Sequence, residues 1–140
     1  MPNSLVPGSP TEGIIFASAI RTETGGVASD GVYDSAELSN SNWRGVRLYI
    51  NRTVATGTLT VSIQGKNPLT GTWVTLVGYT TATLTSAIHT HLTIYPGITA
   101  IGGSGTTSTD YPGILPTCWR VHAVVATNTT TWSIAGEYLL

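Results

Sequence analysis

The stretch Asn42-Trp-Arg-Gly-Val-Arg-Leu-Tyr-Ile-Asn51 alternates apolar and polar side chains, and Gly57-Thr-Leu-Thr-Val-Ser-Ile-Gln-Gly65 repeats the alternation. In the first stretch positions 46, 48 and 50 are apolar, whereas Arg47 and Tyr49 fall on the opposite face of an extended chain. A period of two predicts two half-buried antiparallel strands. The connection Arg52–Thr56 is short enough to join them as a hairpin with a slightly long loop.

The remaining chain repeats this design. Turn residues recur roughly every 8–12 residues, and the chain holds 25 threonines and 16 glycines, residue types that favour strands and turns. Further strands are predicted at 13–22, 72–77, 80–85, 88–95, 117–126 and 132–138, and residues 32–33 and 35–38 are candidates for short edge pieces. We therefore expect an all-β fold, a single antiparallel β-sandwich of jelly-roll-like type with seven to eight strands.

Two segments of the chain depart from this design, a proline-rich start and a long irregular stretch at residues 98–116. Pro2, Pro7 and Pro10 exclude a helix or a central strand near the N-terminus. We predict an extended N-terminal arm over residues 1–13, with a frayed terminus as the alternative, and a β-sandwich domain over residues 14–140. The segment Ile98–Pro116 is predicted to be irregular, and loops of this length are usually functional or disordered.

Composition excludes several classes of function. Only 9% of residues are charged and the net charge is −1, against roughly 25% charged residues in typical domains. The six cations form no basic stripe, so we expect no nucleic-acid partner. No apolar run approaches the roughly 18 residues of a membrane span, so we expect no membrane partner. One cysteine forms no intramolecular disulfide, and no signal-peptide pattern is present, so synthesis in a cytoplasm is expected.

No group of side chains predicts catalysis or a cofactor. His89 and His91 share one face of a strand and could begin a metal site, or could simply face solvent or an interface. Cys118 and His122 lie four residues apart on one strand, about 13 Å, which is too far for a nucleophile and its base. We predict that the protein is not an enzyme and holds no metal or cofactor.

The acidic residues give an equally weak signal. Asp30 and Asp34 could help to hold calcium in a loop, but the ligand spacing of an EF-hand is absent. The other carboxylates lie mostly in predicted loops, and none pairs at a spacing typical of acid–base catalysis.

The aromatic residues carry more information. By alternation, Trp119 and Trp132 fall on core faces, whereas Tyr49 faces outward and Trp43 precedes its strand. Exposed aromatics near Asn and Arg are typical of a sugar-binding face or of a protein interface, and the sequence does not choose between them.

Three segments together resemble a family of virion proteins. They are residues 42–50, residues 59–76, which contain Ile63-Gln-Gly-Lys-Asn-Pro68 and Gly71, and the pair Tyr95-Pro-Gly97 and Leu115-Pro-Thr-Cys-Trp-Arg-Val121. In this order they are similar to small accessory head or neck proteins of tailed bacteriophages, over roughly residues 42–138.

The resemblance implies a capsid decoration (cement) protein on the outside of the head, made in the host cytoplasm, which bridges major capsid subunits. It also implies a homo-oligomer, with a trimer favoured. The candidate interface residues are Leu5 and Val6 of the arm, with Trp43, Arg47 and Tyr49 of the body. The alternatives are a tail or neck connector, and a carbohydrate-binding module with Trp43, Tyr49 and Tyr79 as its aromatic platform.

Overall fold

The computed structural model of the chain describes residues 14–16, 31–52, 58–80, 88–102, 108–126 and 132–140. These residues form strands and no helix, so the predicted all-β class is confirmed, and none of them belongs to a helix long and apolar enough for a membrane crossing. The strands are β1 (Ile14–Phe16), β2 (Gly31–Asp34), β3 (Leu38–Ser39), β4 (Gly45–Arg52), β5 (Thr58–Lys66), β6 (Trp73–Thr80), β7 (Ile88–Ile94), β8 (Thr109–Tyr111), β9 (Cys118–Ala126) and β10 (Trp132–Leu139).

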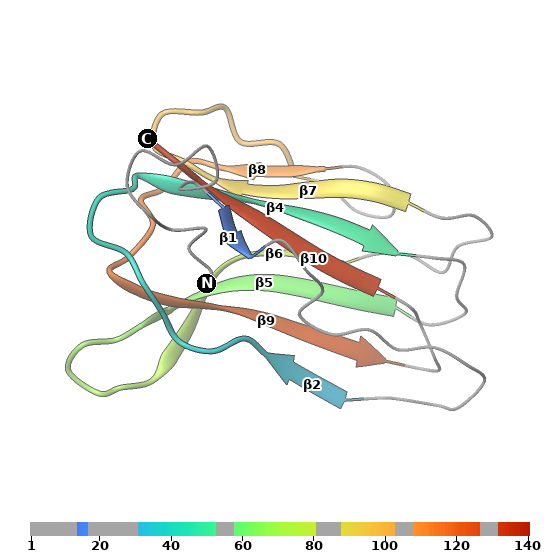
Figure 1. Cartoon of the computed structure of the whole chain (residues 1–140), viewed down its shortest axis with the longest axis horizontal. Helices are drawn as coiled ribbons and strands as arrows, with labels where there is room; N and C mark the ends of the chain where they lie inside the picture. Colours follow the sequence, from blue (N-terminus) through green and yellow to red (C-terminus); the bar gives the residue numbers. More distant parts are fainter. Residues whose placement is uncertain (1–13, 17–30, 53–57, 81–87, 103–107, 127–131) are drawn as a thin grey trace.

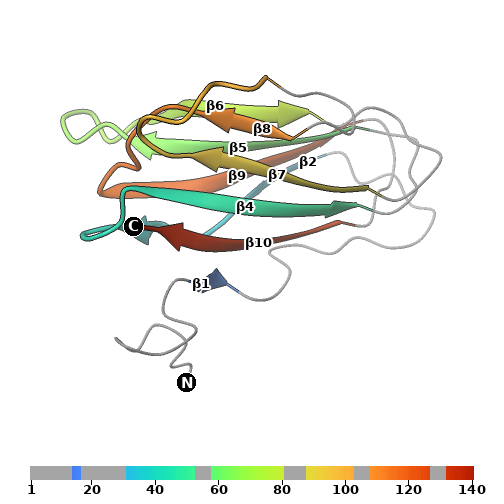
Figure 2. The same ribbon diagram turned by 90° about the horizontal axis from the view of Figure 1, so that it is seen from above.

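The strands form two sheets that run along the long axis of the molecule (Figure 1). Sheet A has the order β1-β10-β4-β7-β8, and sheet B has the order β2-β9-β5-β6, with β3 also paired to β9. Neighbouring strands are antiparallel except for β7 and β8, which are parallel. In Figure 2, β6 and β8 lie together at one margin and β1 lies at the opposite margin.

The core lies between the two sheets, and alternation along the strands fills it. In β9 and in the first five residues of β10 every second residue is buried, and Trp119 and Trp132 are among the largest buried side chains, as predicted. Strand β4 contributes Val46, Leu48 and Ile50, each fully buried. Burial of side chains of this size is the main favourable term in folding, at roughly 1.5–3 kcal/mol each.

The predicted hairpin of β4 and β5 is wrong. Strand β4 pairs with β10 and β7 in sheet A, whereas β5 pairs with β9 and β6 in sheet B. Both strands bury an alternating apolar face. Such a face can be buried whether the two strands are neighbours in one sheet or lie in opposite sheets. A period of two identifies a half-buried strand but not its neighbours. In the structure the chain passes from sheet A to sheet B between β4 and β5.

A bulge reverses the faces of β6 partway along the strand. Ile63 is paired with Val77, but the next residue, Gln64, is paired with Thr75, so Leu76 is the extra residue. Val77 is therefore buried on the core face. Trp73 lies on the outer face, where the guanidinium of Arg120, from β9, lies 4.4 Å from its ring centre. Trp73 and Val77, four residues apart, therefore lie on opposite faces, because a one-residue shift reverses every side chain beyond it.

The stretch expected to be irregular, Ile98–Pro116, contains β8, which lies parallel to β7 at the edge of sheet A. The described residues thus hold ten strands instead of seven to eight, and the fully antiparallel arrangement fails at this one pair. Three residues are too few for alternation to be recognised in the sequence. The predicted arm 1–13, most of the predicted strand 80–85 and part of the Gly102–Asp110 loop lie outside the described residues.

Candidate binding surface on the outer face of sheet A

Strand β4 lies in the middle of sheet A and directs two of the predicted interface residues outward. Arg47 is paired with Glu137 of β10 and Thr93 of β7. Tyr49, two residues further along, is paired with Ala135 and His91. Side chains two residues apart on a strand share a face, so Arg47 and Tyr49 lie side by side on the outer surface, as the sequence predicted.

Tyr49 is the exposed aromatic residue at the centre of this face. Its side chain is flanked on β10 by the small Ala135, and the residue keeps 40% of its surface exposed. Its hydroxyl donates a hydrogen bond to Oε1 of Glu137. This bond, followed by partial burial, raises the pKa of the Tyr49 phenol above its usual range, because the carboxylate holds the phenol in its protonated form.

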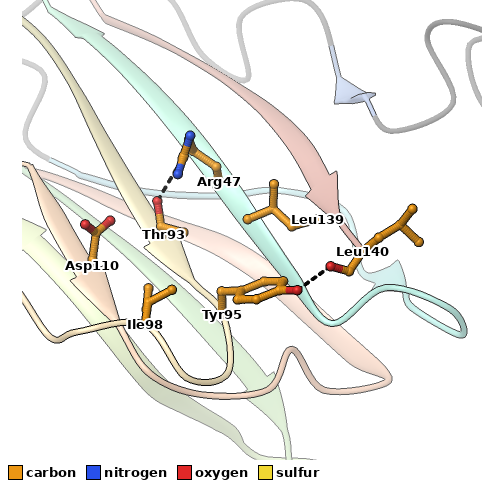
Figure 3. A pocket seen from close by; sticks show the side chains of 7 residues that line it. All are labelled: Arg47, Thr93, Tyr95, Ile98, Asp110, Leu139 and Leu140. Atoms are coloured by element: carbon orange, nitrogen blue, oxygen red, sulfur yellow. Dashed lines mark hydrogen bonds between the residues drawn. The ribbon is translucent and has the colours of Figure 1, made fainter.

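Beside Arg47 the surface opens into a pocket, which we call the Arg47 pocket (Figure 3). Its volume is about 300 Å³, which lies at the lower end of the range for small-ligand sites. The guanidinium Nε of Arg47 donates a hydrogen bond to Oγ1 of Thr93 over 3.1 Å, and the Tyr95 hydroxyl donates one to the main-chain oxygen of Leu140. The lining is formed by Arg47, Thr93, Tyr95, Ile98, Asp110, Leu139 and Leu140.

The two histidines of β7 also lie on this outer face, opposite the buried Leu92, as predicted. Nδ1 of His89 lies 2.7 Å from Oδ1 of Asn51, and Nε2 of His91 lies 3.2 Å from Oδ1 of Asp110. That Asp110 oxygen is buried and makes no well-aligned hydrogen bond. Across the described ranges, no three His, Cys, Asp or Glu side chains gather as a metal site requires.

Trp43 lies away from Arg47 and Tyr49. Its ring stacks on Tyr138 at a centroid distance of 5.5 Å, and Tyr138 in turn meets the buried Trp119 edge-on at 6.0 Å. Asn40 fixes the backbone here, because its Oδ1 accepts a hydrogen bond from the Trp43 N–H over 3.0 Å. Trp43 therefore closes one end of the core. The structure does not bring it to the outer face of sheet A.

The aromatic platform expected of a carbohydrate-binding module is not assembled from its three predicted residues. Trp43 has one ring face against Tyr138, and Tyr79 is 1% exposed because it faces the core. Burial, the largest cause, raises the pKa of the Tyr79 phenol. Of the three, Tyr49 alone stands on the outer face of a sheet.

Other candidate residues have neighbours that explain them. Cys118 lies beside Glu37, and burial, followed by that carboxylate, raises the pKa of the thiol, which disfavours the nucleophilic thiolate. His122 instead contacts Asp34, whose other oxygen lies 3.2 Å from Nη1 of Arg120. Asp34 is therefore paired with Arg120 and in contact with the His122 ring, both from β9. Asp30, Leu5 and Val6 lie outside the described residues.

A second hollow was not anticipated from the sequence. It is an apolar groove of about 430 Å³ beside the β5–β6 turn, lined by Gly65, Lys66, Asn67, Pro68, Leu69, Val74, Leu76 and Pro116. The segment Asn67–Gly71 forms the turn between β5 and β6, and its exposed leucine was not recognised from the sequence as a surface feature. The available signal was an apolar residue within a turn of otherwise polar and turn-forming residues.

Comparison of the chain with family models, with curated proteins and with solved structures returned no match.

Proposed function

We propose that the chain is a structural virion protein of a tailed bacteriophage, a capsid decoration (cement) protein that binds the outer surface of the head. It would stabilise contacts between major capsid subunits as a homo-oligomer, with a trimer favoured, and reside on the capsid surface. The observation that carries the proposal is the strand order of the two sheets, taken together with the sequence resemblance to accessory head and neck proteins.

That strand order supports a jelly roll. Without the short strands β3 and β8, eight strands remain, which can be numbered 1 to 8 along the chain. In these numbers sheet A has the order 1-8-3-6 and sheet B has the order 2-7-4-5. Strands from the beginning and the end of the chain thus alternate within each sheet, as two Greek keys folded together require. Jelly rolls recur in viral capsid proteins and in lectins. A capsid-associated protein is therefore our proposal, and a carbohydrate-binding module is an alternative.

We assign the capsid contact to the outer face of sheet A around Tyr49. Rigid aromatic residues with a polar tip are enriched in protein interfaces because they bury a large area at a small entropic cost. Tyr49 fits this description, since the residue is 40% exposed while its hydroxyl is hydrogen-bonded to Glu137.

The test is a binding assay with heads of the phage that encodes the chain, prepared without this protein in expanded and unexpanded forms. The proposal predicts saturable binding at a fixed ratio to the major capsid protein and a higher disruption temperature of the heads. Absence of binding to both forms would contradict it.

A matched pair of variants tests the assigned face. Tyr49→Ala removes the exposed ring on sheet A, and we expect it to weaken head binding at least about tenfold, as interface anchors typically do. Thr80→Ala changes an exposed side chain on β6 of sheet B and is expected to bind like the unaltered protein. Equal binding of both variants would remove Tyr49 from the contact.

Two alternatives remain with an observation in favour of each. A tail or neck connector agrees with the same sequence resemblance, and it predicts binding to tail fractions instead of heads.

A carbohydrate-binding module is favoured by the lectin-type strand order and by the exposed Tyr49 beside a pocket of about 300 Å³. Retention on a glycan array that Tyr49→Ala abolishes, without head binding, would support this alternative.

A further inference from the structure

The two histidines of β7 lie on the same face of sheet A but contact different partners. His89 is exposed, and its Nδ1 lies 2.7 Å from Oδ1 of Asn51, on β4. His91 is half-buried, and its Nε2 lies 3.2 Å from Oδ1 of Asp110, on β8. The two imidazoles therefore turn different ring nitrogens toward their partners.

The partner of His89 decides which of its ring nitrogens carries the proton. An amide oxygen only accepts hydrogen bonds, so Nδ1 of His89 donates to Oδ1 of Asn51. The amide nitrogen of Asn51 donates in the other direction, to Oγ of Ser133 on β10 over 3.5 Å, which agrees with this orientation. In the neutral ring Nε2 then has no proton and is an acceptor. Protonation makes Nε2 a donor and gives the ring a positive charge.

The charged groups of this face lie beside other residues. Within the described part of the chain, the outer faces of the strands of sheet A carry three charged side chains besides the histidines, namely Arg47, Asp110 and Glu137. The residue opposite His89 on β4 is the neutral Asn51, whereas Asp110 lies against His91 and can compensate a charge on that ring. No charged residue occurs in the chain segments next to these strand ends, 53–57, 81–87 and 127–131.

His89 lies close to Tyr49, the centre of the proposed capsid contact. Strands β4 and β7 are neighbours (Figure 2), with Tyr49 paired to His91 and Asn51 paired to His89. His89 is therefore the diagonal neighbour of Tyr49, and such neighbours are about 7–8 Å apart. A protein surface that covers the Tyr49 ring would cover the His89 ring as well.

We propose that protonation of His89 weakens the contact between sheet A and the capsid, so that binding to heads falls as the pH is lowered from about 8 to about 5. The inference rests on the proposed function and adds a pH dependence to its contact surface. A neutral imidazole can accept a hydrogen bond from the capsid through Nε2. An imidazolium loses that acceptor and is removed from water as a charge with no carboxylate opposite it, which is costly.

The direct test measures the dissociation constant for heads at about pH 8 and about pH 5 with the unaltered protein, His89→Gln and His91→Gln. The same heads are used throughout, so their own titration cancels in the comparison. For the unaltered protein we expect a weakening of about tenfold or more beyond that of His89→Gln, since excluding one proton from the bound state costs up to about tenfold per pH unit. His89→Gln keeps an N–H donor for Asn51 but does not titrate.

His91→Gln is the matched control, and it should show the same pH dependence as the unaltered protein. Equal pH dependence of His89→Gln and the unaltered protein would overturn the inference, and so would tighter binding at low pH that requires His89. Both results leave the proposed function intact. Absence of binding at every pH contradicts the proposed function, and the inference falls with it.

A second measurement tests the premise without heads. Nitrogen NMR of the imidazole rings in the full chain at about pH 8 reports which nitrogen is protonated in the neutral form. We expect a protonated Nδ1 and an unprotonated Nε2 in His89, and a protonated Nε2 in His91. A neutral His89 protonated at Nε2 would overturn the inference, because that nitrogen could then accept no hydrogen bond from a partner.

Discussion

At the scale of single residues, Tyr49 and Glu137 form the pair that defines the outer face of sheet A. Because the carboxylate raises the pKa of the phenol, the bond stabilises the fold while the phenol is protonated. That stability is present below the ordinary phenol pKa of about 10 and is lost as pH rises through the raised pKa of the folded state. In Tyr49→Phe we therefore expect lower stability than in the unaltered protein at pH 8, with the difference shrinking above about pH 10.

The measurement for this prediction is the free energy of unfolding by urea at a series of pH values for the two proteins. Taking the difference between them cancels the titration of Tyr79 and Tyr138, whose phenols also have raised pKa values, mainly because of burial. A difference that stays constant from pH 8 to about pH 11 would mean that the Glu137 bond contributes nothing to stability.

Gly45, at the start of β4, gives a residue-scale prediction about packing. A Cβ at this position would lie 2.0 Å from the carbonyl oxygen of Ile94, which is backbone and cannot move cheaply. Gly45→Ala is expected to lower the free energy of unfolding by about 1–3 kcal/mol or more. The control is Gly102→Ala, where nothing lies within 4 Å of the added carbon and the expected change is below about 0.5 kcal/mol. Equal stability of the two variants in urea unfolding would contradict the close approach of β4 and β7.

At the scale of elements, alternation located the main strands but not their neighbours. The faces of β4 and β9 follow directly from their alternating residues, so the outward positions of Arg47 and Tyr49 were predictable. The partners of β4 were not, since pairing depends on contacts between residues far apart in the chain. The bulge at Leu76 and the brief β8 were missed because neither leaves a period in the sequence, and alternation gave no face for Trp43 because it lies just before its strand.

The assignment of β4 and β5 to different sheets gives an element-scale prediction. Tyr49 and Ala135 face each other on β4 and β10, with Cβ atoms expected about 4.5–5.5 Å apart. In a Cys118→Ser background, Tyr49→Cys with Ala135→Cys should form an intramolecular disulfide on oxidation. Tyr49→Cys with Thr60→Cys, on β5 of the other sheet, should not. Mass spectrometry of the non-reduced proteins distinguishes the outcomes, and the reverse pattern would restore the hairpin of β4 and β5.

At the scale of the whole molecule, the protein combines a well-packed interior with a surface poor in charge. Some charged side chains of the described residues form ion pairs, as in Lys66 with Glu37 at 2.9 Å and Asp34 with Arg120 at 3.2 Å. Among the described residues, the exposed large apolar side chains include Leu69, Val74, Ile114 and Leu140, which lie in or beside turns and strand ends.

The measurement that tests the central claim most directly is electron cryomicroscopy of virions of the tailed phage that we propose encodes this chain, compared with virions made without it. Our account predicts density of the size and shape of this sandwich on the outside of the head, at a constant number of copies per major capsid subunit, which disappears when the protein is absent. Density at the neck or tail, or two identical particles, would contradict a capsid decoration protein.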